Sequence, residues 1–269
     1  MSRSIKKFFL PLLLIMMLAM SGCGSDQQSS KPREVNIVIL AIPNDESVAR
    51  SWYADELGAA LGVKTVILDY VSSVPAINAM ATGNIDIAVF GSPAAAIAVS
   101  RGLDCEIIWL HDIEGDNECL VVKNNSDIES IDGLIGKRVG VPFGSTTHYA
   151  LLNALANAGI ETNQVKILDL QPIDLLDAWQ NDQLDAAFIW QPTLERLLDD
   201  GHVLISSRDL NERGITTADV AVVSRDFARA NPDIVKKYIE LQMKAHNLFK
   251  TNPKQAAAFT AKNLRLTLD

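Results

Sequence analysis

Apolar runs recur along the chain and alternate with segments whose apolar residues follow helical spacing. The run VNIVILAI is almost continuously apolar, which is typical of a strand buried on both faces of a parallel sheet. Strands that alternate with helices predict an α/β fold with parallel sheets. The predicted strands are residues 35–42, 63–70, 85–90, 105–110, 118–122, 132–141 (a turn and its strand), 165–170, 184–189, 203–206 and 218–223. The predicted helices are residues 46–61, 75–81, 148–158, 172–180, 192–199 and 232–250, one that opens at residues 91–93, and one from residue 253 onward.

Two short segments, one in each half of the chain, have similar sequences. NIDIAVF at residues 84–90 is similar to QLDAAFI at residues 183–189, and each follows a short amphipathic helix and precedes a helix opened by proline. We therefore expect two similar lobes with a ligand in the cleft between them, because ligands of such sheets bind at the carboxyl ends of strands. The expected first lobe holds residues 34–122 and 220–269, and the second holds residues 123–219. The chain would cross between the lobes near residues 122–123 and 218–222.

The first residues form a targeting signal. Arg3, Lys6 and Lys7 provide a positive start, and an apolar run over residues 8–20 follows. That run fits the apolar region of a signal peptide and is short for a membrane span of about 20 residues. Small residues precede Cys23, as in a bacterial lipobox.

We therefore expect residues 1–22 to be a lipoprotein signal peptide and Cys23 to carry a lipid. Residues 23–33 are mostly polar and would form a tether. The protein would then lie in the periplasm or on the outer face of the cell membrane, attached to the membrane by its lipid anchor. An uncleaved anchor and a plain secretory signal are the alternatives.

Composition and charge limit the possible partners. Hydrophobic residues make up 48% of the 269 residues and charged ones 21%, which is typical of a globular protein. The net charge is −9, and loss of the three positive charges in residues 1–22 would make it −12. An acidic surface excludes a broad electrostatic grip on nucleic acid, so no nucleic-acid partner is expected.

The three cysteines are too few for a disulfide framework. Cys105 and Cys119 lie in apolar, strand-like runs. Outside the cytoplasm they could form a disulfide. Buried free cysteine is also common in such runs and is the state that we expect, with the disulfide as the alternative that the sequence leaves open.

Three consecutive hydroxyl residues precede a predicted helix. Ser145, Thr146 and Thr147 offer O–H donors where the free N–H groups of the first turn and the helix dipole favour an anion. Capping alone would explain one of the three hydroxyls. A second helix start is offered by Ser92, which is expected to be an N-cap with Pro93 as the first helical residue.

Catalytic signatures are missing from the sequence. It contains no Gly-x-Ser-x-Gly, His-Glu-x-x-His or P-loop motif. The four histidines, at positions 111, 148, 202 and 246, lack the spacing of metal ligands. We therefore predict no catalytic residue, no metal site and no cofactor.

The segment from Ser145 to Leu152, STTHYALL, resembles the periplasmic taurine-binding proteins of taurine and sulfonate ABC transporters. The similarity continues in order and spacing through AGI at residues 158–160, LQP at 170–172, AWQ at 178–180, and on to Asp185 and Trp190. This resemblance implies a two-lobed periplasmic binding protein fold of the type II-like class. It also implies a monomer that captures a small sulfonate and delivers it to an ABC permease driven by a cytoplasmic ATPase.

The resemblance also implies a set of ligand-binding residues. Four hydroxyl residues would hold the sulfonate, two acids would pair with an ammonium, and aromatic side chains would add a cation–π wall. Without the resemblance, Glu118 would be interpreted as a solvated edge charge, Asp219 as a cap and Trp190 as core, and His148 would only stack or cap. The predicted set is Ser92, Glu118, Ser145, Thr146, Thr147, His148, Tyr149, Trp190 and Asp219.

Other functions stay open at this point. The loop at residues 41–45 is not closely like its counterpart in the family, so the ligand could be another small anion or amino-anion, such as an alkanesulfonate or a nitrate-like ion. An enzyme on the same fold, like the thiamin-pyrimidine synthases, is a further alternative, although it would carry a Cys-rich motif that is absent here. A sensory binding protein is the third. Family members usually continue beyond the position of Asp269, so a short variant or a truncated sequence is expected.

Overall fold

The computed structural model describes residues 33–40, 42–70 and 72–266. The predicted signal peptide, the lipidation site Cys23 and almost all of the tether lie outside these residues. Within the described part of the chain, no helix is both long enough and apolar enough to span a bilayer.

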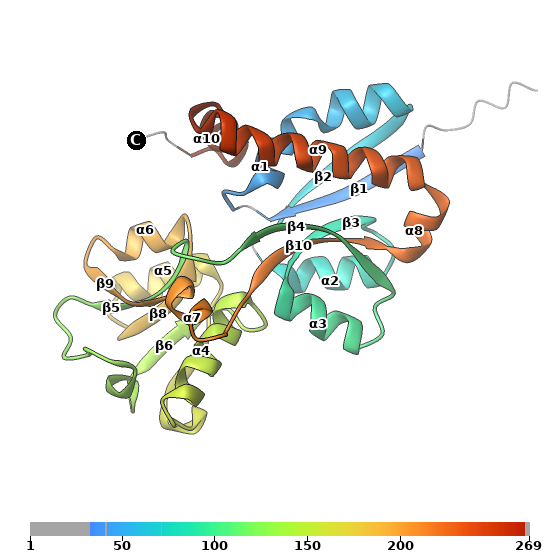
Figure 1. Cartoon of the computed structure of the whole chain (residues 1–269). Coiled ribbons are helices and arrows are strands. Elements are labelled where there is room, and N and C mark those ends of the chain that lie inside the picture. The colour runs from blue at the N-terminus through green and yellow to red at the C-terminus, as the bar shows by residue number, and fades with distance from the viewer. Residues whose placement is uncertain (1–32, 41, 71, 267–269) are drawn as a thin grey trace, which may run out of the picture. The chain divides into compact units, whose positions relative to one another are not determined.

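The first of two five-stranded sheets is mixed, with strand order β2-β1-β3-β10-β4 (Figure 1). β1 pairs in parallel with β2 and β3, whereas β10 runs antiparallel between β3 and β4. The strands are β1 (Arg33–Leu40), β2 (Val63–Tyr70), β3 (Ile87–Gly91), β4 (Cys105–Ile113) and β10 (Ala218–Ser224).

The second sheet repeats this plan with the order β7-β6-β8-β5-β9. β6 pairs in parallel with β7 and β8, and β5 runs antiparallel between β8 and β9. The strands are β5 (Glu118–Lys123), β6 (Arg138–Val141), β7 (Lys166–Asp169), β8 (Ala186–Trp190) and β9 (Gly201–Ser206).

Helices cover both faces of each sheet, so each sheet has one layer of hydrophobic core on either face. In the first sheet, α1, α9 and α10 enclose one layer, and α2 and α3 enclose the other. In the second sheet, α4 and α7 pack on one face and α5 and α6 on the other. The helices are α1 (Asp45–Trp52), continued by the π-helix η1 (Tyr53–Ala59), α2 (Ser73–Ala81), α3 (Ser92–Ser100), α4 (Thr146–Asn157), α5 (Pro172–Gln180), α6 (Thr193–Leu197), α7 (Ser207–Asn211), α8 (Arg225–Ala230), α9 (Pro232–Thr251) and α10 (Pro253–Leu264), with short 3-10 turns η2 (Ile131–Leu134) and η3 (Thr162–Gln164).

The sheets differ from the expected parallel ones because each takes in one antiparallel strand. β5 belongs to the second sheet, although residues 118–122 were expected in the first lobe. The chain therefore crosses between the sheets at residues 114–117 and again at residues 212–217. These two crossings lie side by side, since the Glu114 N–H donates to the Thr217 carbonyl at 3.0 Å. Hydrophobic periodicity detects strands but carries no information on their direction or neighbours.

Cys105 and Cys119 are both buried free thiols. They lie in different sheets, Cys105 on β4 and Cys119 on β5. Of the two states that the sequence left open, the structure therefore has the free one.

Candidate functional site

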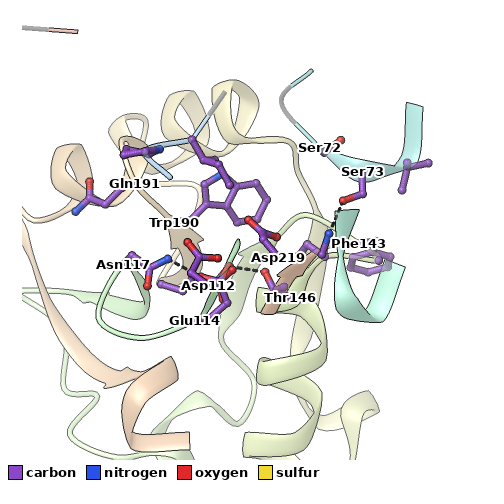
Figure 2. A pocket seen from close by; sticks show the side chains of 17 residues that line it. Ser72, Ser73, Asp112, Glu114, Asn117, Phe143, Thr146, Trp190, Gln191 and Asp219 are labelled. Carbon is purple, nitrogen blue, oxygen red and sulfur yellow. Dashed lines mark hydrogen bonds between the residues drawn. The ribbon is translucent and has the colours of Figure 1, made fainter. Parts of the chain in front are cut away.

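A small cavity of about 120 Å³ lies between the two sheets (Figure 2). Its walls come from the carboxyl ends of the parallel strands β1, β3, β6 and β8 and from the segments that follow them, as expected for α/β sheets. The antiparallel strands β4, β5 and β10 complete it. The lining residues are Ile42, Pro43, Ser72, Ser73, Val74, Gly91, Asp112, Glu114, Asn117, Glu118, Phe143, Gly144, Ser145, Thr146, Trp190, Gln191 and Asp219.

The start of α4, which contributes Ser145 and Thr146 to the cavity wall, has free backbone donors. Ser145 is its N-cap, and the Ser145 Oγ accepts the His148 N–H at 3.1 Å. The N–H groups of Thr146 and Thr147 have no hydrogen-bond partner among the described residues. Two N–H groups at the positive end of a 12-residue helix form a local environment that favours an anion.

The three hydroxyls at this helix start are already engaged with protein groups. Ser145 Oγ donates to the Pro142 carbonyl at 2.6 Å and shares a hydrogen bond of 2.9 Å with Thr147 Oγ1. The Thr146 hydroxyl donates to the carboxylate of Glu118. Backbone N–H groups rather than these hydroxyls are therefore the free donors at the start of α4.

Four carboxyl groups also line the cavity, and one of them, Glu118, accepts the Thr146 hydroxyl at the start of α4. Glu114 and Glu118 are each 2% exposed and Asp219 is 4% exposed, while Asp112 is partly buried. Strand register brings them together, because β10 places Asp219 directly opposite Asp112 on β4. Figure 2 shows Asp112 and Asp219 beside the indole of Trp190. Of the described residues that line the cavity, every ionisable one is a carboxylic acid.

Burial raises the pKa of all four acids. Burial, opposed by the charge of nearby His111, raises the pKa of Asp112 to about 6. For Glu118, burial outweighs the Thr146 hydrogen bond and, with the charge of Asp219, raises the pKa to about 8. The pKa values of Glu114 and Asp219 lie well above the ordinary range, because burial is joined by repulsion from neighbouring carboxylates.

Trp190 is the last residue of β8; its side chain is partly buried, packs against the core of the second sheet and also lines the cavity. It pairs in register with Glu118 on β5. An indole face beside carboxylates provides a surface for a cationic group.

Four of the residues predicted from the sequence are absent from the cavity wall. Thr147 is buried against Ser145, and Ser92 is the first residue of α3 rather than its N-cap, with Oγ accepting the Ala218 N–H at 3.1 Å. His148 stacks on Phe143 with ring centroids 4.3 Å apart, and burial lowers its pKa. Tyr149 is 43% exposed. A direct ligand contact of these four stays a prediction that the geometry does not support.

Sequence reasoning missed six polar residues that line the cavity. Two belong to the start of α2, three to the end of β4 and the crossing that follows it, and one follows β8. Ligands bind near strand ends, so Asp112 would have been found if the predicted strand 105–110 had been extended to its observed end. The six are Ser72, Ser73, Asp112, Glu114, Asn117 and Gln191.

Three of the acids also have the geometry of cation ligands. Each of Asp112, Glu114 and Asp219 offers one oxygen, and these oxygens all lie within 4.8 Å of one another. Carboxylate oxygens this close together stabilise a cationic group such as an ammonium. Chain spacing did not reveal this cluster, because Asp219 lies on β10, far along the chain from Asp112 and Glu114.

Two mixed sheets, joined by two crossings and enclosing a small cavity at their strand ends, define the chain as a two-lobed periplasmic binding protein fold. The periplasmic aliphatic sulphonate binding protein SsuA from Escherichia coli has the same fold, with a TM-score of 0.74 and 24% identity over 88% of this chain and 80% of that one. The desulfurization enzyme DSZB is a more distant match, with a TM-score of 0.61 and 15% identity over 87% and 81% of the two chains.

Sequence comparison gives the family. The chain belongs to the NMT1/THI5-like family, whose model matches residues 48–256. It is 37% identical to the taurine-binding periplasmic protein of Escherichia coli over 223 residues, which are 81% of this chain and 68% of that protein.

Proposed function

We propose that this protein is the extracytoplasmic solute-binding component of an ABC importer and that it captures taurine or a related small sulfonate with an ammonium group. The carrying observation is the division of the polar groups around the cavity into two kinds. Free N–H groups at the start of α4 would stabilise an anion, and the ionisable side chains of the wall, all of them acids, would stabilise a cation.

A zwitterion with separated charges matches this division. A sulfonate is a permanent anion and is stabilised by helix N-terminal N–H groups without an arginine. An ammonium is stabilised by Asp219 and its neighbouring acids and by the face of Trp190. The similarity to a protein named for taurine binding supports the same ligand class.

The cavity also argues against the other candidate functions. Four buried carboxyl groups offer no opposite charge to an amine-free anion such as an alkanesulfonate or nitrate, and such an anion brings them no counter-ion. The described lining residues contain no Cys, His or Lys, so the common nucleophile–base pairs Ser–His and Cys–His are missing from them, which supports a binding role over catalysis.

The proposed partners are a membrane permease and its cytoplasmic ATPase, which would receive the ligand from this protein as a monomer. We also propose that a lipid on Cys23 anchors the protein to a membrane, in the periplasm or on the outer face of the cell membrane. If so, the full-length Cys23→Ala variant should lose its place in the membrane fraction on cell fractionation. Unchanged fractionation would contradict the anchor.

Calorimetric titration tests the ligand. Taurine should bind with a micromolar or lower Kd, whereas sulfate, glycine and the amine-free analogue ethanesulfonate should bind at least tenfold more weakly. Asp219→Asn should weaken taurine at least tenfold and leave ethanesulfonate unchanged or tighter, because it removes a buried negative charge beside the ammonium.

Asp116→Asn is the matched control for this variant. Asp116 lies in the crossing next to Asn117, but its side chain is 61% exposed and pairs with Arg208 outside the cavity. It should bind taurine like the unmodified protein. Equal losses of taurine and ethanesulfonate in Asp219→Asn would contradict the ammonium role, and no heat with taurine would contradict the ligand.

A further inference from the structure

Neighbouring groups leave the acids of this cavity incompletely neutralised. Glu118 receives hydrogen bonds from Thr146 and, at 3.2 Å, from Ser207. Glu114 receives one from Asn117 Nδ2 at 2.5 Å. No described residue donates a hydrogen bond to the carboxyl group of Asp219, although that residue is only 4% exposed.

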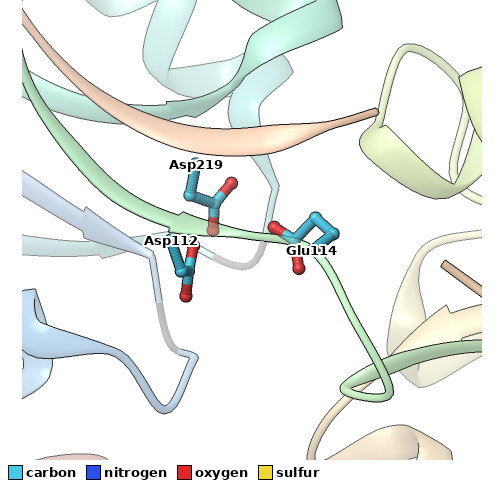
Figure 3. A group of neighbouring side chains, drawn as sticks. All are labelled: Asp112, Glu114 and Asp219. Atoms are coloured by element: carbon cyan, nitrogen blue, oxygen red, sulfur yellow. The ribbon is translucent and has the colours of Figure 1, made fainter. Parts of the chain in front are cut away.

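Asp112 adds a second open position, because its Oδ1 is buried without a hydrogen-bond partner. Figure 3 shows the carboxyls of Asp112, Glu114 and Asp219 projecting from neighbouring strands into one region. Their nearest oxygens all lie within 4.8 Å of one another. Fully ionised carboxylates at that separation and burial repel each other strongly.

The nearest cationic side chain is already committed elsewhere. His111 precedes Asp112 on β4 and forms a buried ion pair with Asp45. Glu46 lies 4.0 Å from the other ring nitrogen of His111, and His246 lies 3.9 Å from Asp45. His111 therefore lies beside two acids of α1, and its charge only partly offsets the burial of Asp112 and Asp219.

In the absence of a ligand, the cavity must therefore hold protons in place of a counter-ion. The pKa values agree with this, because those of Asp112 and Glu118 are about 6 and about 8, and those of the other two acids are higher than usual. At neutral pH a part of the cluster is protonated.

We propose that Asp112, Glu114, Glu118 and Asp219 exchange protons for the ammonium group of the ligand, so that binding of an ammonium-bearing sulfonate releases protons. This inference rests on the proposed function and extends it, since it makes Asp112 and Glu114 specificity-determining residues. The ammonium brings one positive charge into the cluster, and the carboxyl protons leave to the solvent. An amine-free sulfonate brings only negative charge and must bind with no release of protons or with uptake.

The direction of the pH dependence follows from this exchange. Ligand affinity rises with pH wherever the free protein holds protons that the complex does not, by about tenfold per pH unit for each proton released. Between pH 6 and pH 8, taurine should therefore bind more tightly as pH rises. Ethanesulfonate should bind equally or less tightly over the same range.

Titration calorimetry in several buffers measures the exchange directly. At pH 7, the heat of taurine binding is measured in buffers with different ionisation enthalpies, and the slope gives the number of protons released. We expect at least half a proton for taurine and none released for ethanesulfonate. All solutions are treated with a chelating resin, so that displacement of a divalent cation from the same oxygens is not counted.

Two variants locate the protons. Glu118→Gln and Asp112→Asn should each lower the number of protons released by taurine and flatten the dependence of Kd on pH between 6 and 8. Asp116→Asn, which removes an exposed acid from the same crossing, should leave both unchanged.

The outcomes separate the two proposals. Taurine binding with no proton release and with a Kd independent of pH from 6 to 8 would overturn this inference and leave the proposed function standing. No taurine binding at any pH would overturn both. Because the main measurement uses the unmodified protein, the result does not depend on whether a variant folds.

Discussion

His111 forms a buried ion pair that links a strand of the first sheet to a helix packed on it. Its ring is buried, its Nδ1 is hydrogen-bonded to Asp45, and Asp45 also accepts the Trp109 indole N–H at 3.0 Å. Burial lowers the pKa of His111, but the hydrogen bond and charge of Asp45, together with Glu46, more than offset this and raise it to about 9. A positive histidine therefore holds α1 to β4 at neutral pH.

This ion pair predicts how stability changes with pH. A histidine with a raised pKa in the folded state contributes stability that is complete below its ordinary pKa and is lost as pH rises through 9. One pKa unit is about 1.4 kcal/mol, so the contribution of His111 to the free energy of unfolding should fall by on the order of 3 kcal/mol between pH 6 and pH 9.5. Urea denaturation across this range measures the loss.

The same experiment on two variants isolates the residue. His111→Asn should be less stable at pH 6 and should lose on the order of 3 kcal/mol less stability on going to pH 9.5, because the remaining loss comes from the buried acids of the cavity, whose pKa values are also raised. His202→Asn changes an exposed histidine on β9 and should keep the full pH dependence. If His111→Asn loses as much as the unmodified protein over this range, the charged pair is not the cause.

Residue chemistry explains part of what the sequence could and could not predict. The hydroxyl run at 145–147 correctly indicated a helix start at the site. Its interpretation as a set of sulfonate donors stays a prediction, and the structure adds that the Thr146 hydroxyl donates to Glu118. Side-chain partners that lie 28 positions away cannot be assigned from local spacing.

At the scale of elements, the apolar pattern located most strands and helices to within a few residues, and β2 and α5 at their observed bounds. It missed the short helices α7 and α8, although Ser206 and Ser224 cap them as ordinary start signals would predict. What the pattern could not contain is strand order. The insertion of β10 beside β4 creates the Asp112–Asp219 pair, so this pairing was beyond sequence reasoning, although Asp219 itself was predicted.

Gly91 marks the contact between the starts of α3 and α4, which belong to different sheets. A Cβ atom at this position would lie 2.9 Å from Thr146 Cγ2 and 3.7 Å from the Thr146 backbone nitrogen. Gly91→Ala should therefore force the two helix starts apart and open the cavity. We expect at least tenfold weaker taurine binding by calorimetry, with little change in the thermal midpoint of the ligand-free protein.

Gly115→Ala provides the control for that substitution. Gly115 lies in the crossing between the sheets, but a Cβ there would have its nearest atoms at 3.7 Å and 3.8 Å, which are ordinary contacts. It should bind taurine normally. Unchanged affinity in Gly91→Ala would show that the close approach at Thr146 is not needed for binding.

At the scale of the whole molecule, the sequence predicted two α/β units and a site between them. The similarity of residues 84–90 to residues 183–189 indicated two units, and the binding of ligands at the carboxyl ends of strands indicated the site. It misplaced the boundary, since β5 was assigned to the first unit. The internal sequence similarity covers only parallel strands. It gives no information on β5 and β10, the antiparallel strand of each sheet.

The position of β10 in the sequence, after all strands of the second sheet, limits when the first sheet can be completed. The hydrogen bond from Ala218 to Ser92 joins residues 126 positions apart, and β10 pairs with β3 and β4 only after the whole second sheet has been made. Contacts this distant along the chain are formed slowly. The second sheet is continuous in sequence and can form first, whereas the lobe that begins the chain is completed last. A nascent chain of this kind keeps β3 and β4 unjoined until about residue 224 has been synthesised, which is compatible with passage through a membrane before folding.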